Sequence, residues 1–369
     1  MVQPVVFSTY PARLEQLTHF MRGLSVGLFV FVISPLNTYS MTVFLLPSLA
    51  LSIGLVLVAF SADRLISASA TYAKHCNISL IFIGMTVVAF GTSAPELLVS
   101  AVAALNNAGE LAVGNGIGSN IINIGLVLSI AVLMAPIQAN KRFIKKEFPI
   151  LAGSMLICSA LMSTGKLNIT DGLLLVIFLA VYCFYLAKSV RQGEVSEDDL
   201  EFLPLTKKRA GWESLVMLLL LLTSSRLMVW GAVNLAQLAG LSELTIGLTI
   251  IAFGTSLPEL AAAIAGVRRG MYDIVFATVI GSNIFNLLGV IAIPSIVGQE
   301  LIIPEQVVSR DIPYMIILTG VLGVMLAVPL LKSQSSSNKQ ATYTLHRWGG
   351  TLPLMIFIAY LTKVANSAF

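Results

Sequence analysis

Long apolar segments alternate with short polar connections along most of this chain. From residue 41 onward, ten segments have the length of a membrane span, at about residues 43–72, 78–104, 112–135, 148–164, 170–188, 212–238, 243–266, 273–297, 312–331 and 348–365. A transmembrane helix needs about 20 apolar residues, and lipid offers no hydrogen-bond partner to an exposed backbone amide. We therefore expect an all-α integral membrane protein, because the residue alternation of an outer-membrane barrel is absent.

Composition excludes an ordinary soluble enzyme. Of the 369 residues, 57% are hydrophobic and only 11% are charged, against roughly 25% charged in typical soluble domains. No nucleophile and base occur at a workable spacing, so we expect neither an enzyme nor a bound cofactor. The formal charge of +4 would suggest a nucleic-acid partner in a soluble chain, but here the basic residues mark membrane sides, and the lipid bilayer is the expected partner.

Basic residues concentrate in alternate connections between the predicted spans. These are Lys74; Lys141, Arg142, Lys145 and Lys146; Lys188, Arg191, Lys207, Lys208 and Arg209; Arg268 and Arg269; and Lys332, Lys339 and Arg347. The other connections hold only Lys166 and Arg310, with Lys363 near the C-terminus. Because cytoplasmic loops carry the excess of Lys and Arg, residue 41 is expected outside and these connections in the cytoplasm.

The same pattern divides the chain into four parts. Residues 41–190 and 212–369 each hold five predicted spans, and residues 191–211 form a solvated cytoplasmic linker. Residues 1–40 are an extension of uncertain status, because their apolar run is too short for a confident span. They could form a poor eleventh helix, an interfacial segment or a signal-like segment that is absent from the mature protein.

Two sequence motifs occur twice. Residues 83–97 and 246–260 agree at eleven of fifteen positions, and residues 117–123 and 280–286 agree at six of seven. Both pairs are separated by 163 positions, so they belong to one internal repeat. Basic residues precede the first copy and follow the second, which indicates that the two copies cross the membrane in opposite directions. Inverted repeats with Gly- and Pro-interrupted spans are typical of secondary transporters, whose site lies near the midplane.

The repeated motif concentrates oxygen ligands inside the membrane. Glu96 and Glu259 lie within spans at equivalent positions, and each carboxylate costs roughly 2.5–3.5 kcal/mol at the bilayer centre unless it is compensated. A divalent cation provides that compensation, and Ca²⁺ prefers six to eight carboxylate, carbonyl and hydroxyl oxygens. The hydroxyl residues beside the two glutamates are Thr92, Ser93, Thr255 and Ser256.

Proline and residue spacing add to this chemistry. Pro95 and Pro258 lack the amides that would bond the carbonyls of Gly91 and Gly254, so backbone oxygens are freed near the carboxylates. Three pairs at i, i+4 spacing each point from one helix face, namely Thr92 with Glu96, Ser119 with Asn123, and Ser282 with Asn286. Four interrupted or polar helices could thus enclose one ion path.

Simpler explanations exist for some of these residues. Small residues such as Gly-Thr-Ser often serve tight helix packing, but packing does not explain a duplicated glutamate. A serine-hydrolase triad fails for want of a nearby histidine. The charges near or within the long first and sixth spans, Asp63, Arg64 and Arg226, are expected to form local ion pairs or to snorkel, and they are left out of the site.

These motifs resemble the alpha repeats of the cation/calcium antiporter superfamily, in particular its short bacterial sodium/calcium exchanger branch. The resemblance covers about nine-tenths of the chain, from Met41 to the end. It implies ten helices in two inverted five-helix halves, in the bacterial inner membrane, with ion sites formed by the second, third, seventh and eighth spans.

The resemblance also assigns roles to individual residues. It implies that Glu96 and Glu259 bind Ca²⁺ centrally, helped by the carbonyls of Thr92 and Thr255. The flanking Na⁺ positions would be lined by Ser93, Ser256, Ser119, Ser282 and the carbonyls of Ala89 and Ala252, with Asn123 and Asn286 completing the middle.

One departure from the family pattern concerns the counter-ion. Well-known sodium/calcium members carry an aspartate where this chain has Asn286, which leaves two carboxylates in place of three. We therefore expect a Ca²⁺/Na⁺ antiporter, with a Ca²⁺/H⁺ antiporter as the main alternative and a passive cation channel as a less favoured one. The oligomeric state is left open.

Overall fold

The computed structural model describes six stretches of the chain. They are residues 39–105, 109–189, 202–239, 252–297, 301–334 and 342–368. The chain divides into two units, Met1–Leu45 and Leu46–Phe369, and the description that follows concerns the second. The predicted extension at residues 1–40 therefore lies almost wholly outside the described residues, as does most of the predicted linker.

Helices in the first half follow the predicted spans closely. They are α2 (Tyr39–Cys76), α3 (Leu80–Ile83), α4 (Ala89–Thr92), α5 (Ala94–Leu105), α6 (Gly109–Ile122), α7 (Ser129–Met134), α8 (Phe148–Met162) and α9 (Ile169–Ser189). Those of the second half are α10 (Lys207–Leu238), α12 (Ala252–Thr255), α13 (Leu257–Arg268), α14 (Tyr272–Phe285), α15 (Ala292–Val297), α16 (Ile312–Gln334) and α17 (Thr351–Ala368). The predicted class, a mostly helical membrane protein, is confirmed.

Membrane-spanning capacity is shown for fewer segments than the ten predicted. Among the described residues, seven helices are long and apolar enough to cross a bilayer, or eight if the bent pair Leu80–Thr92 and Ala94–Leu105 counts as one span. The predicted fourth span corresponds to α8, which has only 15 residues. The predicted seventh span begins in residues that lie outside the described part.

Both repeat motifs break their helices where proline and glycine predict it. The axis bends by 41° between Leu80–Thr92 and Ala94–Leu105, and Ser93 at the break has φ −80° and ψ 0°. In the second copy α12 ends at Thr255 and α13 begins at Leu257, with Ser256 at φ −90° and ψ 6°. The breaks follow from the missing amides of Pro95 and Pro258, which interrupt the helical hydrogen-bond pattern.

Wide π-helical turns recur at matching positions of the two halves. They are η1 (Gly84–Val88), η2 (Asn123–Leu128), η3 (Phe143–Glu147), η5 (Asn286–Val290) and η6 (Val307–Asp311). The turns η2 and η5 begin 163 residues apart, which is the offset of the sequence repeat. The repeat is therefore visible in the local backbone, and π turns are frequent at functional sites.

Four short strands depart from the all-α expectation. They are β1 (Ile137–Asn140), β2 (Lys166–Leu167), β3 (Leu301–Ile302) and β4 (Thr342–Leu345). β1 pairs antiparallel with β4, with Ile137 opposite Leu345, and β2 pairs antiparallel with β3, with Lys166 opposite Ile302. They lie in the connections, where the hydrophobic pattern of the spans gives no signal. Each pair joins one strand from each half of the chain.

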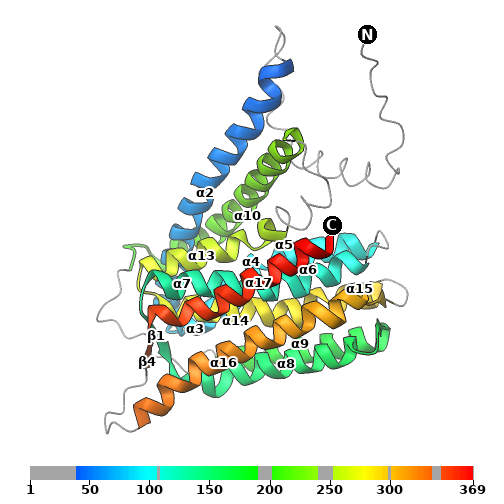
Figure 1. Cartoon of the computed structure of the whole chain (residues 1–369). Coiled ribbons are helices and arrows are strands. Elements are labelled where there is room, and N and C mark those ends of the chain that lie inside the picture. The colour runs from blue at the N-terminus through cyan, green and yellow to red at the C-terminus, as the bar shows by residue number, and fades with distance from the viewer. Residues whose placement is uncertain are drawn as a thin grey trace, which may run out of the picture. The chain divides into compact units, whose positions relative to one another are not determined.

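The helices carrying the motifs lie in the core of a bundle. In Figure 1, α8, α9, α14, α16 and α17 run roughly side by side, and α14 packs against η1, α4 and α8. In the most apolar stretch of Tyr272–Val297 every residue is buried (100%). In the corresponding stretches of α9 and α10, only 22% of the residues are buried. A helix buried on all sides has to be apolar all round, as this one is, apart from its motif residues.

The long helices α2 and α10 pack closely against each other. A Cβ on Gly231 of α10 would lie 2.6 Å from the carbonyl oxygen of Pro47, and one on Gly54 of α2 would lie 2.8 Å from the Cβ of Met228. Small residues at such contacts let two membrane helices approach closely. α10 also packs against α4, α12 and α13, so this helix touches both interrupted motifs.

Asp63 and Arg64 of α2 form ion pairs, as expected, with partners from distant parts of the sequence. Asp63 accepts hydrogen bonds from Arg269, which follows α13, and Arg64 pairs with Glu213 of α10. These partners are 206 and 149 residues away in the sequence. Helix periodicity carries no information about such distant partners.

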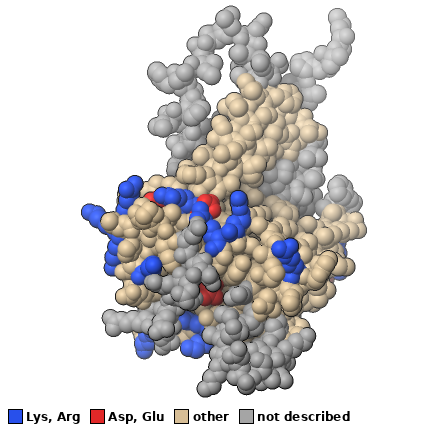
Figure 2. All heavy atoms as spheres, turned by 90° about the vertical axis from the view of Figure 1, so that its left-hand side faces the viewer, with Lys and Arg blue, Asp and Glu red and all other residues tan. Residues whose placement is uncertain are grey.

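Lys and Arg side chains gather on one face of the molecule. Figure 2 shows this face, at the end of the bundle where β1 and β4 lie in Figure 1. Basic residues that are exposed near the ends of helical segments include Lys145, Lys146, Lys207, Lys208, Arg209 and Arg268.

Candidate functional site

The two repeated glutamates lie in equivalent places, each in the first turn after a helix break. Glu96 belongs to the first turn of α5 and Glu259 to the first turn of α13. Both are 0% exposed. Carboxylates without contact to solvent are expensive unless a charge or hydrogen bonds compensate them, so the surroundings of these two groups decide what they can do.

Glu259 is approached by hydroxyl groups from both halves. The Ser93 hydroxyl donates a hydrogen bond of 3.4 Å to Oε1 of Glu259, and the hydroxyls of Thr92 and Ser282 interact with the same carboxylate. Thr92 Oγ1 lies 3.5 Å from Ser282 Oγ. The motif of the first half therefore builds the surroundings of the glutamate in the second half.

Glu96 has fewer partners. Neither of its carboxylate oxygens has a hydrogen-bond partner within the described part of the chain. Its electrostatic neighbours are Glu259, which repels it, and Arg226 of α10, which attracts it, while the Ser119 hydroxyl lies close by. A buried carboxylate in this state costs free energy, and a bound cation would remove that cost.

Asparagine side chains continue the polar path between η2 and α14. Asn123 Nδ2 donates a hydrogen bond of 3.1 Å to Oδ1 of Asn283. Asn286, which begins η5, is fully buried, and neither its amide nitrogen nor its oxygen has a partner among the described residues. Sequence reasoning missed Asn283, although this residue stands in the same Gly-Ser-Asn repeat that gave Ser282.

The predicted ligand residues are only partly brought together. The fully buried ones are Thr92, Ser93, Glu96, Asn123, Glu259, Ser282 and Asn286, and Ser119 and Ser256 are 2% exposed. Thr255 is half-buried, and Ala252 is described only as the first residue of α12. Because Ser256 Oγ has no partner within the described ranges, it is available as a ligand.

The carbonyl of Ala89 is already engaged. It accepts hydrogen bonds from the Ser93 amide at 3.0 Å, from Thr92 Oγ1 at 3.3 Å and from Ser282 Oγ at 3.3 Å. A carbonyl oxygen has two lone pairs, so this one is oversubscribed. A cation could bind here only if one of these donors turned away.

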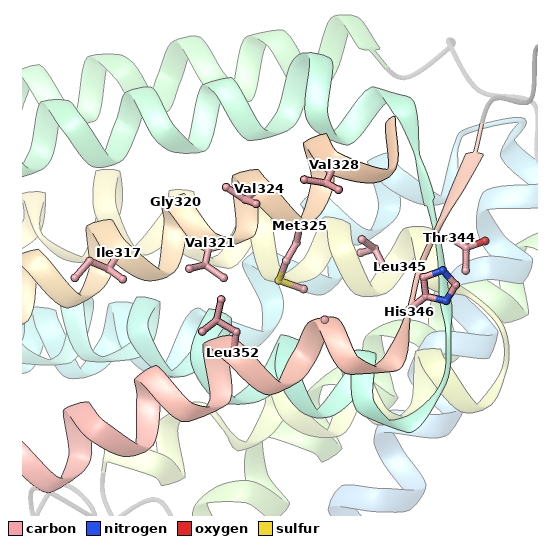
Figure 3. Close-up of a pocket in the computed structure, with 11 residues that line it drawn as sticks. Ile317, Gly320, Val321, Val324, Met325, Val328, Thr344, Leu345, His346 and Leu352 are labelled. Atoms are coloured by element: carbon pink, nitrogen blue, oxygen red, sulfur yellow. The ribbon is translucent and has the colours of Figure 1, made fainter. Parts of the chain in front are cut away.

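An open groove elsewhere in the fold lacks such chemistry. It lies between α16 and α17, has a volume of about 660 Å³, and is lined by Ile317, Val321, Val324, Met325 and Leu352 among others (Figure 3). Thr344 and His346 lie at one end of this groove. The residues that line it include no carboxylate.

A family model described as "Sodium/calcium exchanger protein" matches residues 46–188 and 211–365. The chain belongs to this family. The two matched ranges contain both repeat motifs and the two buried glutamates. The expectation of a transporter rather than an enzyme is thereby confirmed.

Relatives of this exchanger are named as antiporters or membrane proteins. It is 38% identical to the "Putative antiporter CaxA" of Alkalimonas amylolytica, over 84% of this chain and 95% of the relative. It is 37% identical to the "Inner membrane protein YrbG" of Escherichia coli strain K12, over 76% of this chain and 89% of the relative. The resemblance predicted from the motifs is therefore confirmed.

Solved structures of the sodium-calcium exchanger NCX_Mj resemble this exchanger. The form soaked with Na⁺ and Ca²⁺ aligns with a TM-score of 0.73 and 29% identity, and the match covers 86% of this chain and 98% of the other. These likenesses place the exchanger among multi-pass membrane proteins that transport cations, including Ca²⁺.

Proposed function

We propose that this chain exchanges Ca²⁺ for Na⁺ by alternating access, with Glu96 and Glu259 binding the cation near the membrane midplane. The observation that supports this most directly is the pair of fully buried carboxylates, of which three oxygens lack a partner within the described residues. Oxygen-only surroundings suit Ca²⁺ and Na⁺ and do not suit soft metals. Both ions are substrates of the transport cycle and not resident cofactors.

The remaining predicted ligands keep the roles that the family suggests. We propose that Ser93, Ser256, Ser119 and Ser282 serve the Na⁺ positions, and that Asn123 and Asn286 complete the middle. Thr92 and Thr255 would contribute carbonyls to the Ca²⁺ position. Ala89 and Ala252 would contribute carbonyls to the Na⁺ positions once local hydrogen bonds rearrange. Support comes from the burial of most of these residues around the two glutamates.

The topology is part of the proposal. We infer two inverted halves of five spans each, 41–190 and 212–369, joined by a cytoplasmic linker at 191–211. The π turns η2 and η5 at the repeat offset support the halves, and the basic face in Figure 2 supports a cytoplasmic side at that end. We also propose the bacterial inner membrane as its location, which the name of the Escherichia coli relative supports.

Charge balance limits the stoichiometry. Two carboxylates are neutralised by one Ca²⁺ or by two monovalent cations, so three Na⁺ ions would leave the loaded site positive by one. A membrane potential acts on such a charge with about 2.3 kcal/mol per 100 mV. Exchange of three Na⁺ for one Ca²⁺ would therefore respond to voltage, whereas exchange of two would not.

Ca²⁺ uptake into reconstituted proteoliposomes tests the exchange. An outward Na⁺ gradient should drive uptake well beyond the rate without a gradient, and an imposed H⁺ gradient of equal size should drive much less. Uptake that follows H⁺ would favour the proton-coupled alternative. Uptake that ignores both gradients and follows only the potential would identify a passive channel.

The Asn286→Asp variant should make transport more dependent on pH. A new carboxylate would be a third negative charge near Glu96 and Glu259, and three such charges in a buried site favour the uptake of a proton. Protons should then compete with Ca²⁺ around neutral pH, so that transport falls as pH falls through this range. The measurement is Na⁺-driven and H⁺-driven Ca²⁺ flux from pH 6 to pH 9 in both proteins.

The matched control is Asn168→Asp, since Asn168 is exposed and its Oδ1 accepts from the amides of Thr170 and Asp171, bonds that an aspartate would keep. Its pH profile should stay close to that of the wild type. If Asn286→Asp folds normally and its profile superimposes on the wild type, Asn286 does not belong to the ion site.

A further inference from the structure

Asn283 of α14 forms a hydrogen bond with a proposed ion ligand of the other half. Its Oδ1 accepts a bond of 3.1 Å from Nδ2 of Asn123, the first residue of η2. The two residues lie 160 positions apart in the sequence, and they are 1% and 0% exposed. Because water does not compete for a bond buried in this way, the bond fixes the two amides relative to each other.

The residue before Asn283 already belongs to the surroundings of the glutamates. The Ser282 hydroxyl donates a hydrogen bond of 3.3 Å to the Ala89 carbonyl and lies 3.5 Å from Thr92 Oγ1, both in the first motif. Successive helix residues point about 100° apart, so Ser282 faces α4 while Asn283 faces η2. α14 packs against both of these elements, and it therefore contacts two groups of proposed ligands in the first half.

The bond determines which atom Asn123 has left for a ligand. An asparagine carries its donor and its acceptor on the same carbon, so a bond that holds Nδ2 also sets the direction of Oδ1. Oδ1 of Asn123 is buried and has no partner within the described residues. With the amide turned by 180°, a donor-only NH₂ group would stand in that place, and such a group does not bind a cation.

We propose that Asn283 is a positioning residue of the ion site, which holds the Asn123 amide with its oxygen toward the transported cation. The inference rests on the proposed function, because it takes Asn123 as a ligand of that cation. Asn283 acts through Asn123 and is not itself a ligand. The residue that orients the ligand of one half thus comes from the other half.

The internal repeat provides a comparison for this bond. Asn120 and Asn286 are the repeat equivalents of Asn283 and Asn123, at the offset of 163 positions. The equivalent bond would run from Nδ2 of Asn286 to Oδ1 of Asn120, but neither atom has a partner within the described ranges. Nδ2 of Asn120 instead lies 3.9 Å from the sulfur of Met315. Asn120 is therefore a buried amide of the same type that does not hold a proposed ligand.

The test is a double-mutant cycle, measured by titration calorimetry of the full-length protein in detergent with Ca²⁺. Asn283→Leu removes the acceptor, and the half-saturating Ca²⁺ concentration should rise about three- to tenfold, as for the loss of one buried hydrogen bond. Asn123→Leu removes the ligand oxygen and should raise this concentration at least as much. The double variant should match Asn123→Leu alone, because Asn283 then has no ligand to orient. Two independent packing defects would instead give factors that multiply.

Asn120→Leu is the matched control, since Asn120 is also 1% exposed. Its Ca²⁺ affinity should stay within about twofold of the wild type, because no hydrogen bond to a proposed ligand is lost. In Na⁺-driven uptake, Asn283→Leu should raise the half-saturating Ca²⁺ concentration and lower the maximal rate by less than about twofold, as expected when binding alone is weakened. Asn283→Ala is a second variant without the amide, should the leucine protein fold poorly.

The outcomes separate this inference from the function on which it rests. Unchanged affinity in the folded Asn283 variants, equal losses in Asn283→Leu and Asn120→Leu, or multiplying factors in the double variant would overturn the positioning role and leave the proposed exchange intact. Unchanged affinity in Asn123→Leu would remove that residue from the ligands, and this inference with it. A wild-type protein without saturable Ca²⁺ binding would overturn the proposed function itself.

Discussion

Glu96→Gln and Glu259→Gln should each abolish Ca²⁺ transport, with a loss of at least about 100-fold, because each removes half of the charge that balances a divalent ion in a buried site. Both carboxylates are 0% exposed, so solvent screening does not compensate for the lost negative charge. Folding should survive, since a neutral amide is less costly in lipid than an ionised carboxylate. Thermal stability of the ion-free protein should be unchanged or raised.

Proteoliposome uptake of Ca²⁺ and thermal unfolding in detergent measure these two effects. The control is Glu110→Gln, which alters an exposed carboxylate in the first turn of α6 and should leave transport within about twofold of the wild type. Normal affinity and rate in either buried variant would refute the assignment of the central site. Loss of transport together with loss of folded protein would show a structural role instead.

Gly281→Ala should destabilise the protein strongly, whereas the same substitution at the repeat-equivalent Gly118 should be tolerated. A Cβ on Gly281 of α14 would lie 2.8 Å from the Cβ of Ala89 and 3.2 Å from the Cα of Met85, and one on Gly118 would meet nothing within 4 Å. Overpacking of this kind costs roughly 1–3 kcal/mol. Because Ala89 and Ser282 lie beside the contact, transport should fall as well.

Melting temperatures from size-exclusion chromatography of heated samples compare the two variants directly. Gly118→Ala should match or slightly exceed the wild type, since alanine is the better helix former. Equal melting temperatures for the two variants would mean that α14 can move away from η1 without cost, contrary to the packing described.

The burial of Glu96 and Glu259 at equivalent positions could be predicted from sequence because the motif is repeated. A second copy at a constant offset separates Glu96 and Glu259 from acidic residues in loops, and Pro95 and Pro258 mark the helix breaks by their chemistry alone. Apolar length predicted the seven or eight spans that the described residues show. These features are local, so a single sequence contains them.

Features that depend on distant partners could not be predicted in this way. A π turn such as η2 shifts a few hydrogen bonds within an apolar helix and leaves its composition unchanged. The pair of Asp63 with Arg269 joins residues from different halves of the chain, and the role of Asn283 follows from its contact with Asn123.

The two strand pairs have a consequence for how the halves are held together. The strand before the fourth predicted span, β1, pairs with the strand before the tenth, β4, and the strand before the ninth, β3, pairs with the strand before the fifth, β2. Each half thus offers the other the same two elements, which is the reciprocity of an isologous dimer interface. If the two halves were made as separate polypeptides, each would still carry the strands that both ladders need.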